Sequence, residues 1–238
     1  KSALVVRNVK WITLGLAFAL PAVLFWFANR SPALWILGMA AASQVLGLLA
    51  ERWLDSRFPA DNGVALHQRA LAFRKSSATG WALNVGCGCN TRFNRLFRDQ
   101  GLALEGIDIS ERMVALARAA DPDVPVHHAD ICDWEPSRGY RCISAWDSLW
   151  HVALSQQRPV LLKLMAALEP GGCFLFTAGG LEAPAEHRDS HMGPELYYAT
   201  LGIPALCDVI REGRCHCLHL EFDQFPETHL SVIVRRCE

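Results

Sequence analysis

The sequence has almost no net charge, because 23 Lys and Arg residues nearly balance 24 Asp and Glu residues and leave a formal charge of -1 at pH 7. The chain as a whole therefore has no electrostatic attraction to nucleic acid, and we expect no nucleic-acid partner. Internal repeats and low-complexity tracts are also absent. Since 51% of the 238 residues are hydrophobic, the chain can build a sizeable core, which excludes a disordered protein.

A disulfide framework is not expected either, although the chain contains nine cysteines. Their number is odd, and the chain lacks the short, loop-rich layout of a disulfide-stapled domain, so we expect reduced thiols. Cys87 and Cys89 are one residue apart, whereas zinc sites use two-residue spacing and a second ligand pair nearby. Cys215 and Cys217 fit better as small residues on the core face of a strand. We therefore expect no metal site.

Charge is missing from two runs near the start of the chain, residues 11–28 and 33–50. Each run is about long enough to cross roughly 30 Å of hydrocarbon as a helix. The sequence predicts a two-helix transmembrane hairpin over residues 1–54, in contact with lipid through residues 11–50. Lys and Arg residues flank its outer ends, so we expect a membrane protein whose remaining chain lies on the cytoplasmic side. A buried helical pair of a soluble protein is the alternative.

The composition changes after this region. Residues 55–63 have the Pro, Gly and Asn content of a linker, and residues 64–238 form the second predicted domain. Short apolar runs alternate there with helical patterns, which is typical of an α/β fold with a mostly parallel sheet. Strands are predicted at 81–85, 103–107, 124–128, 140–146, 173–177, 215–222 and 230–235. Helices are predicted at 64–73, 91–99, 111–119, 156–168 and 204–212.

The connections between these elements predict where a ligand binds. Ligands of parallel sheets bind beyond the carboxyl ends of the strands. Gly86 and Gly88 follow the first strand and precede a helix, where a missing side chain lets the backbone turn tightly and approach a ligand. Asp108 ends the second strand about twenty residues later, where an acid can accept both hydroxyls of a ribose. The sequence therefore predicts a nucleoside-containing cofactor. The last two strands are too close for a helical crossover and should pair as an antiparallel hairpin.

From about residue 81 to residue 236 the chain resembles the class I S-adenosylmethionine-dependent methyltransferases. Five motifs match in order: "LNVGCGCN", "GIDIS", "HADI", "ISAWDSLWHV" and "LEPGGCFLFT". The resemblance implies a Rossmann-like seven-stranded sheet with a terminal antiparallel hairpin, S-adenosylmethionine as cofactor and methyl transfer to a small-molecule acceptor. Two positions depart from the pattern, since Asn84 replaces the usual acid and Asn90 replaces the third glycine.

The motifs, together with the segments that follow the fourth and fifth strands, predict two sets of site residues. The residues expected to bind the cofactor are Asn84, Gly86, Cys87, Gly88, Asn90, Asp108, Ile109, Met113, Asp130, Ile131, Trp146 and Asp147. The candidate catalytic residues are Trp150, His151 and Tyr197, and Trp146 is also expected near the acceptor. Asp147 is expected to bind the methionine amine. The polar segment from Glu186 to Tyr198, which includes His191, is expected to be a loop over the acceptor, and Glu221, Asp223 and His229 are expected to be turn residues.

Two other functions share some of these features. A nicotinamide-dependent oxidoreductase would also use a glycine turn and a ribose acid, but its longer G-x-G-x-x-G pattern is not met by the residues after Gly88, which are Cys, Asn and Thr. A domain that binds a nucleoside ligand without turnover is the second alternative.

Overall fold

A computed structural model describes residues 63–75, 79–89, 91–190 and 195–238. The predicted transmembrane hairpin at residues 1–54 and nearly all of the predicted linker lie outside these ranges. None of the helices formed by the described residues is long and apolar enough to cross a membrane.

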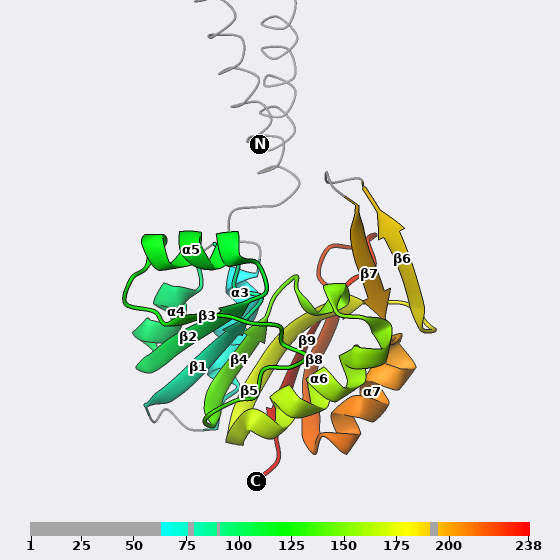
Figure 1. The fold of residues 1–238 in the computed structure, drawn as a ribbon. Coiled ribbons are helices and arrows are strands. Elements are labelled where there is room, and N and C mark those ends of the chain that lie inside the picture. Colours follow the sequence, from blue (N-terminus) through cyan, green and yellow to red (C-terminus); the bar gives the residue numbers. More distant parts are fainter. Residues whose placement is uncertain (1–62, 76–78, 90, 191–194) are drawn as a thin grey trace, which may run out of the picture. The chain divides into compact units, whose positions relative to one another are not determined.

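A seven-stranded sheet forms the centre of the fold, as the alternation predicts (Figure 1). Its spatial order is β3-β2-β1-β4-β5-β9-β8. The first five strands along the chain pair in parallel, and β9 pairs antiparallel with both β5 and β8. The bounds are β1 Gly80–Val85, β2 Leu102–Asp108, β3 Val126–His128, β4 Tyr140–Ala145, β5 Leu168–Gly179, β8 Cys215–Phe222 and β9 His229–Arg236.

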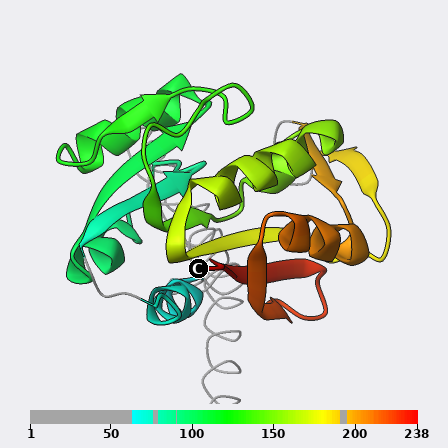
Figure 2. The ribbon, with the colours of Figure 1, turned by 90° about the horizontal axis from the view of Figure 1, so that it is seen from below.

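Helices cover both faces of this sheet. One face carries α3 (Val64–Ala72), α4 (Asn94–Asp99) and α5 (Glu111–Ala120), and the other carries α6 (Leu154–Ala167) and α7 (Ile203–Glu212). The last two lie side by side (Figure 2). Ser110 caps α5, because its hydroxyl accepts a hydrogen bond from the Met113 amide at 3.4 Å. Pro204 stands in the first turn of α7 and Gly213 follows its last residue, as predicted.

Strand alternation divides the core into two apolar layers. Leu83 and Val85 of β1 pack in the layer with α6 and α7, whereas Ala82 packs with α3, α4 and α5. All three side chains are buried. Fully burying a side chain the size of Leu or Val contributes about 1.5 to 3 kcal/mol, so Leu83 and Val85 stabilise the carboxyl end of β1.

The polar segment after β5 differs from its prediction as a loop. It forms an antiparallel pair of strands, β6 (Ala185–Asp189) and β7 (Leu196–Thr200). His187 and Tyr198 are directly opposite each other, and their rings stack at 5.2 Å. Such cross-strand pairs stabilise a hairpin even where one face is exposed. His191 lies outside the described residues.

Candidate active site

A cleft of about 510 Å³ lies at the carboxyl ends of β1, β2 and β4. In the sheet, β2 and β3 lie on one side of β1 and β4 lies on its other side. The chain crosses over between β3 and β4, so the strand order reverses at this point. The lining residues are Val85, Gly86, Ile107, Asp108, Ile109, Ala129, Asp130, Ile131, Cys132, Asp147, Ser148, Leu149, His151, Val152, Ala153 and Gln156. The predicted binding edge therefore contains a real cavity.

The glycine turn forms one wall of the cleft. Gly86 has φ 64°, and a Cβ there would lie 2.3 Å from the Ser148 Cβ, so only glycine fits. Gly88 also has a positive φ, 55°, but a Cβ there would meet nothing within 4 Å. Its amide donates a hydrogen bond to the Asp108 Oδ2 at 2.8 Å. Gly86 is thus required because a side chain would clash there, whereas Gly88 is favoured only because of its backbone conformation.

Two carboxylates from neighbouring strands face this cleft. The Asp108 Oδ1 accepts from the Ser110 amide at 2.8 Å, so each oxygen of Asp108 accepts one backbone hydrogen bond. The Asp130 Oδ1 accepts from the Cys132 amide at 2.8 Å. Because a carboxylate has about four acceptor positions, both groups keep capacity for a ligand. The loops hold the two acids in place before any ligand binds.

Cys87 of the turn is not placed as a reactive group. Cys87 is half-buried and packs against Gly106, 3.0 Å from the position of a Cβ there. Burial, together with the charge of Asp108, raises the pKa of Cys87 to about 12, so the thiol keeps its proton at neutral pH. Cys89 is exposed. In the described ranges, no three His, Cys, Asp or Glu side chains come together in a way that could hold a metal ion.

A second cavity of about 230 Å³ lies beside the first, between the end of β5, the β6–β7 hairpin and the start of β9. Its lining is Trp150, Ala178, Gly179, Leu181, Ala185, His187, Tyr198, Ala199, Thr200, Glu227, Thr228 and His229. Aromatic rings and short polar side chains therefore surround a space suited to a small organic molecule.

The candidate catalytic residues occupy different places. Trp150 lines the 230 Å³ pocket and His151 the 510 Å³ cleft, but Tyr197 lines neither. The Trp150 indole donates to the His151 Nε2 at 3.1 Å, and the His151 Nδ1 donates to the Tyr197 carbonyl at 2.9 Å. Both ring nitrogens of His151 are therefore engaged, so it is not poised as a proton acceptor. Tyr197 donates its hydroxyl to Glu186, and Tyr198 takes the pocket position expected of Tyr197.

Five of the described residues expected at the cofactor do not line the cleft: Asn84, Cys87, Gly88, Met113 and Trp146. Asn84 is 5% exposed and faces the other side of the sheet, where it lines a small separate void with Cys87. Trp146 is buried in the α3 and α4 layer, 5.6 Å from the His67 ring. Met113 lies in α5 and contributes its amide to the helix cap. Strand alternation is the cause for Asn84, because the neighbours of a cleft-facing strand residue such as Val85 point to the opposite face. Asn90 lies outside the described residues.

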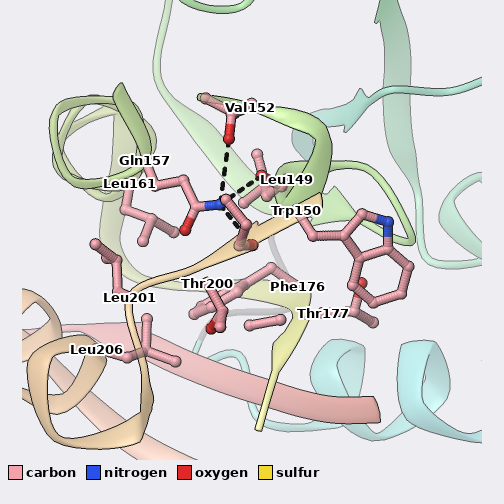
Figure 3. A pocket seen from close by; sticks show the side chains of 12 residues that line it. Leu149, Trp150, Val152, Gln157, Leu161, Phe176, Thr177, Thr200, Leu201 and Leu206 are labelled. Carbon is pink, nitrogen blue, oxygen red and sulfur yellow. Dashed lines mark hydrogen bonds between the residues drawn. The ribbon is translucent and has the colours of Figure 1, made fainter. Parts of the chain in front are cut away.

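A buried glutamine, which sequence reasoning missed, joins the cleft region to the hairpin. The Gln157 amide donates to the Ala199 carbonyl at 2.8 Å and to the Leu149 and Val152 carbonyls at 3.3 Å. Figure 3 shows these bonds beside a small, mostly apolar cavity of about 20 Å³. A polar residue on the buried face of the predicted helix was the available signal, because buried amides need partners.

Sequence reasoning also missed the importance of Asp223 and His229. His229 is the first residue of β9, and because β9 is antiparallel to β5, its start lies at the carboxyl edge of the parallel strands. The His229 Nε2 is 3.0 Å from the Asp147 Oδ1, and its Nδ1 is 2.6 Å from the Asp223 Oδ1. The antiparallel pairing that the sequence predicts for the last two strands implies that the final strand starts at this edge of the sheet.

Comparisons with known proteins agree with this geometry. Residues 82–172 match the family model described as "Methyltransferase domain". The dTDP-3-amino-3,6-dideoxy-alpha-D-glucopyranose N,N-dimethyltransferase of Streptomyces fradiae is 30% identical over 99 residues, which are 41% of this chain and 38% of that protein. The trans-aconitate 2-methyltransferase of Acidovorax sp. strain JS42 is 38% identical over 91 residues, 38% of this chain and 34% of that protein. The chain thus spans little more than a third of these relatives.

Solved structures show the same fold. An S-adenosylmethionine-dependent methyltransferase from Clostridium acetobutylicum superposes with a TM-score of 0.59 at 11% identity, covering 82% of this chain and 100% of that chain. An amino pentose methyltransferase from Micromonospora echinaspora, solved with SAM bound, gives 0.57 at 15% identity, covering 74% and 90%. The described domain therefore has the Rossmann-like fold of these enzymes, as the five motifs implied.

Proposed function

We propose that this chain is an S-adenosylmethionine-dependent methyltransferase that acts on a small molecule. The observation that carries the proposal is the 510 Å³ cleft at the reversal point of the sheet, where the glycine turn and two carboxylates face one cavity. The match of residues 82–172 to a methyltransferase domain supports it. The five motifs, in order, support the same cofactor.

The residues of the cleft fit this cofactor. Asp108 would accept the ribose hydroxyls, and Asp130 would lie on the adenine side, each with acceptor positions left over after its backbone bonds. The turn at Gly86 leaves open the space that a side chain would fill. Asp147, which also lines the cleft, would bind the positively charged amine at the methionine end.

Bound S-adenosylmethionine supplies a methyl group on a sulfonium, which is already activated for displacement. The chain therefore has to align the acceptor, hold the two molecules together and exclude water. The aromatic walls of the 230 Å³ pocket, Trp150 and Tyr198, would orient the acceptor next to the cleft. His151 is engaged at both nitrogens, so we expect an acceptor that needs no strong base.

Product analysis tests the activity. The purified protein is incubated with methyl-labelled S-adenosylmethionine and a small-molecule cell extract, and labelled products are identified. The relatives methylate an amino sugar and trans-aconitate according to their names, so amines and carboxylic acids are examined first. We expect a labelled small molecule that disappears with Asp108→Ala. Label found only in protein or nucleic acid would contradict a small-molecule acceptor.

Calorimetric titration separates this function from its main alternative. We expect saturable binding of S-adenosylmethionine and none of NAD, because the turn after Gly88 lacks the longer pyrophosphate-binding pattern. Saturable binding of NAD alone would overturn the assignment. Binding of S-adenosylmethionine with no labelled product from any extract would favour a non-catalytic binding domain.

We also propose that residues 1–54 tether the enzyme to the cytoplasmic face of a membrane. The support is the absence of charge from residues 11–28 and 33–50 together with the basic residues at their outer ends. Fractionation of two proteins tests this. The full chain should sediment with membranes, and the piece from Asp61 to Glu238 should remain in the supernatant and bind the cofactor. If the shorter piece also sediments with membranes, the hairpin is not the tether.

A further inference from the structure

His229 occupies an unusual position between two carboxylates. Its Nε2 lies 3.0 Å from the Asp147 Oδ1 and its Nδ1 lies 2.6 Å from the Asp223 Oδ1. The His229 side chain is 10% exposed and that of Asp223 is 9% exposed. Asp147 follows β4, whereas Asp223 follows β8 and His229 begins β9. The tertiary structure therefore brings the terminal hairpin to Asp147.

This geometry fixes the protonation state of the ring. A neutral imidazole carries one N–H, whereas two carboxylates at hydrogen-bond distance need two donors. Although burial lowers it, the hydrogen bonds to Asp147 and Asp223 raise the pKa of His229 to about 9. His229 is therefore a cation at neutral pH with both protons donated, so it cannot act as a general base.

The three residues also stand at a defined place between the cavities. Asp147 lines the 510 Å³ cleft, whereas His229 lines the 230 Å³ pocket, so their hydrogen bond crosses the wall between the two. Asp147 has φ 51°, a left-handed conformation that is rare for a residue with a side chain, and its amide donates to the Thr177 Oγ1 at 2.8 Å. Strained residues persist where the surroundings hold them firmly, and they concentrate at functional sites.

We propose that His229 is a positioning residue which holds the Asp147 carboxylate toward the cofactor's positively charged end and joins the cofactor cleft to the acceptor pocket. This inference rests on the proposed function, because it needs S-adenosylmethionine in the cleft. One oxygen of Asp147 is taken by the imidazolium, which leaves the other to accept from the amine. Asp223 fixes the far side of the ring. Arg92 is a further cation close enough to Asp147 to interact with it.

A double-mutant cycle tests whether His229 acts through Asp147. S-adenosylmethionine is titrated calorimetrically into the full chain and into His229→Asn, Asp147→Asn and the double variant. We expect His229→Asn to weaken binding about tenfold, because one charge-assisted hydrogen bond no longer orients Asp147. Asp147→Asn should weaken it at least as much. The double variant should bind no more weakly than Asp147→Asn alone, since the histidine then has nothing to orient. If the losses of affinity in the two single variants multiply in the double variant, the proposal is overturned.

His219→Asn is the matched control. His219 lies on the same terminal hairpin and faces a carboxylate, with its Nε2 3.1 Å from the Glu221 Oε2, but it lines neither cavity. We expect it to bind S-adenosylmethionine as the unaltered chain does. An equal loss in His219→Asn and His229→Asn would mean that the hairpin matters only for stability, which would overturn a positioning role.

A second measurement does not depend on how the variants fold. In ¹⁵N NMR spectra of the unaltered protein, both His229 ring nitrogens should be protonated at pH 7. An unprotonated ring nitrogen there would overturn the proposal. Failure of the unaltered chain to bind S-adenosylmethionine would instead overturn the proposed function itself. Normal binding by the unaltered chain and by His229→Asn would overturn only the role of His229.

Discussion

One wall of the cleft beside β1 and β2 is a glycine turn whose backbone sets its shape, whereas the pocket beside β5 and β9 is walled by aromatic and polar side chains. Gly86 lines the cleft, and the amide of Gly88 in the same turn fixes the Asp108 carboxylate. The pocket is bounded by Trp150, Tyr198 and other side chains contributed by hairpins. A wall formed by backbone keeps the same shape when side chains are substituted, which suits a ligand that stays the same. A wall formed by loop side chains changes with each substitution, which suits a ligand that differs between proteins of one fold.

Among the substitutions, Gly86→Ala should disrupt the glycine turn of the cofactor cleft most severely. The new Cβ would lie 2.3 Å from the Ser148 Cβ, and φ 64° is unfavourable for alanine, so the turn must move. We expect cofactor binding to weaken by more than about a hundredfold and the free energy of unfolding to fall by several kcal/mol, which is on the order of an overpacked core. Calorimetry and thermal unfolding measure the two effects.

Gly88→Ala is the matched control for this substitution. It adds the same methyl group at a similar φ, but no atom lies within 4 Å of it. Only the backbone strain remains, about 1 kcal/mol. Equal losses in the two variants would mean that strain, and not the contact with Ser148, makes the turn need glycine.

Asp108→Ala should have the next largest effect. It removes the acceptor for the ribose hydroxyls and also frees the amides of Gly88 and Ser110, which the carboxylate holds at 2.8 Å. We expect at least roughly a hundredfold weaker cofactor binding, because each charge-assisted bond contributes about 1.5 to 3 kcal/mol. Cys89→Ser, at an exposed neighbour in the same turn, should change the affinity by less than about twofold. A large loss in Cys89→Ser with none in Asp108→Ala would point to thiol chemistry instead.

The sequence predicts the glycine turn and the ribose acid of the cleft better than the residues of the acceptor pocket. Gly86, Gly88 and Asp108 act through local geometry that follows from their place between a strand and a helix. The motifs predict Asn84 and Trp146 at the cofactor, but side-chain alternation along β1 turns Asn84 to the other face, and Trp146 is buried among α3 and α4 residues. His229 and Asp223 matter because the strand order brings them to Asp147, which a local pattern does not encode. The β6–β7 hairpin was missed because its polar strands resemble a loop.

Two histidines whose pKa values are shifted in opposite directions offer a test based on pH. In α3, burial lowers the pKa of His67 to about 4, and the uncharged ring is hydrogen-bonded to Ser144 and Gly63. The unfolded chain binds this proton near pH 6.5, so the free energy of unfolding should fall as the pH drops from about 6.5 toward 4, by up to about 3 kcal/mol. On the acceptor side, burial lowers the pKa of His229 but the bonds to Asp147 and Asp223 raise it to about 9. Its contribution is complete below about pH 6.5 and is lost as the pH rises through 9.

Thermal unfolding across pH 4 to 10 measures both slopes. His67→Gln should flatten the acid slope and leave the alkaline one, and His229→Asn should do the reverse. If His229→Asn leaves the alkaline slope unchanged, the imidazole is not held as a cation between its two carboxylates.

The smallest expected effect concerns Tyr197, a candidate catalytic residue from the polar segment after the fifth strand, which the structure places outside both cavities. Its hydroxyl donates to the Glu186 Oε2 at 2.7 Å and accepts from the Leu154 amide at 3.1 Å, so it fastens the β6–β7 hairpin to the start of α6. These groups are exposed or half-buried, and water can replace the bonds, so Tyr197→Phe should lower the free energy of unfolding by no more than about 1 kcal/mol. Methyl transfer should change little, and Tyr198→Ala should reduce it more because that ring lines the pocket. Label incorporation and thermal unfolding of both variants check this. If Tyr197→Phe abolishes transfer without altering stability, Tyr197 is catalytic and the acceptor does not bind in the 230 Å³ pocket.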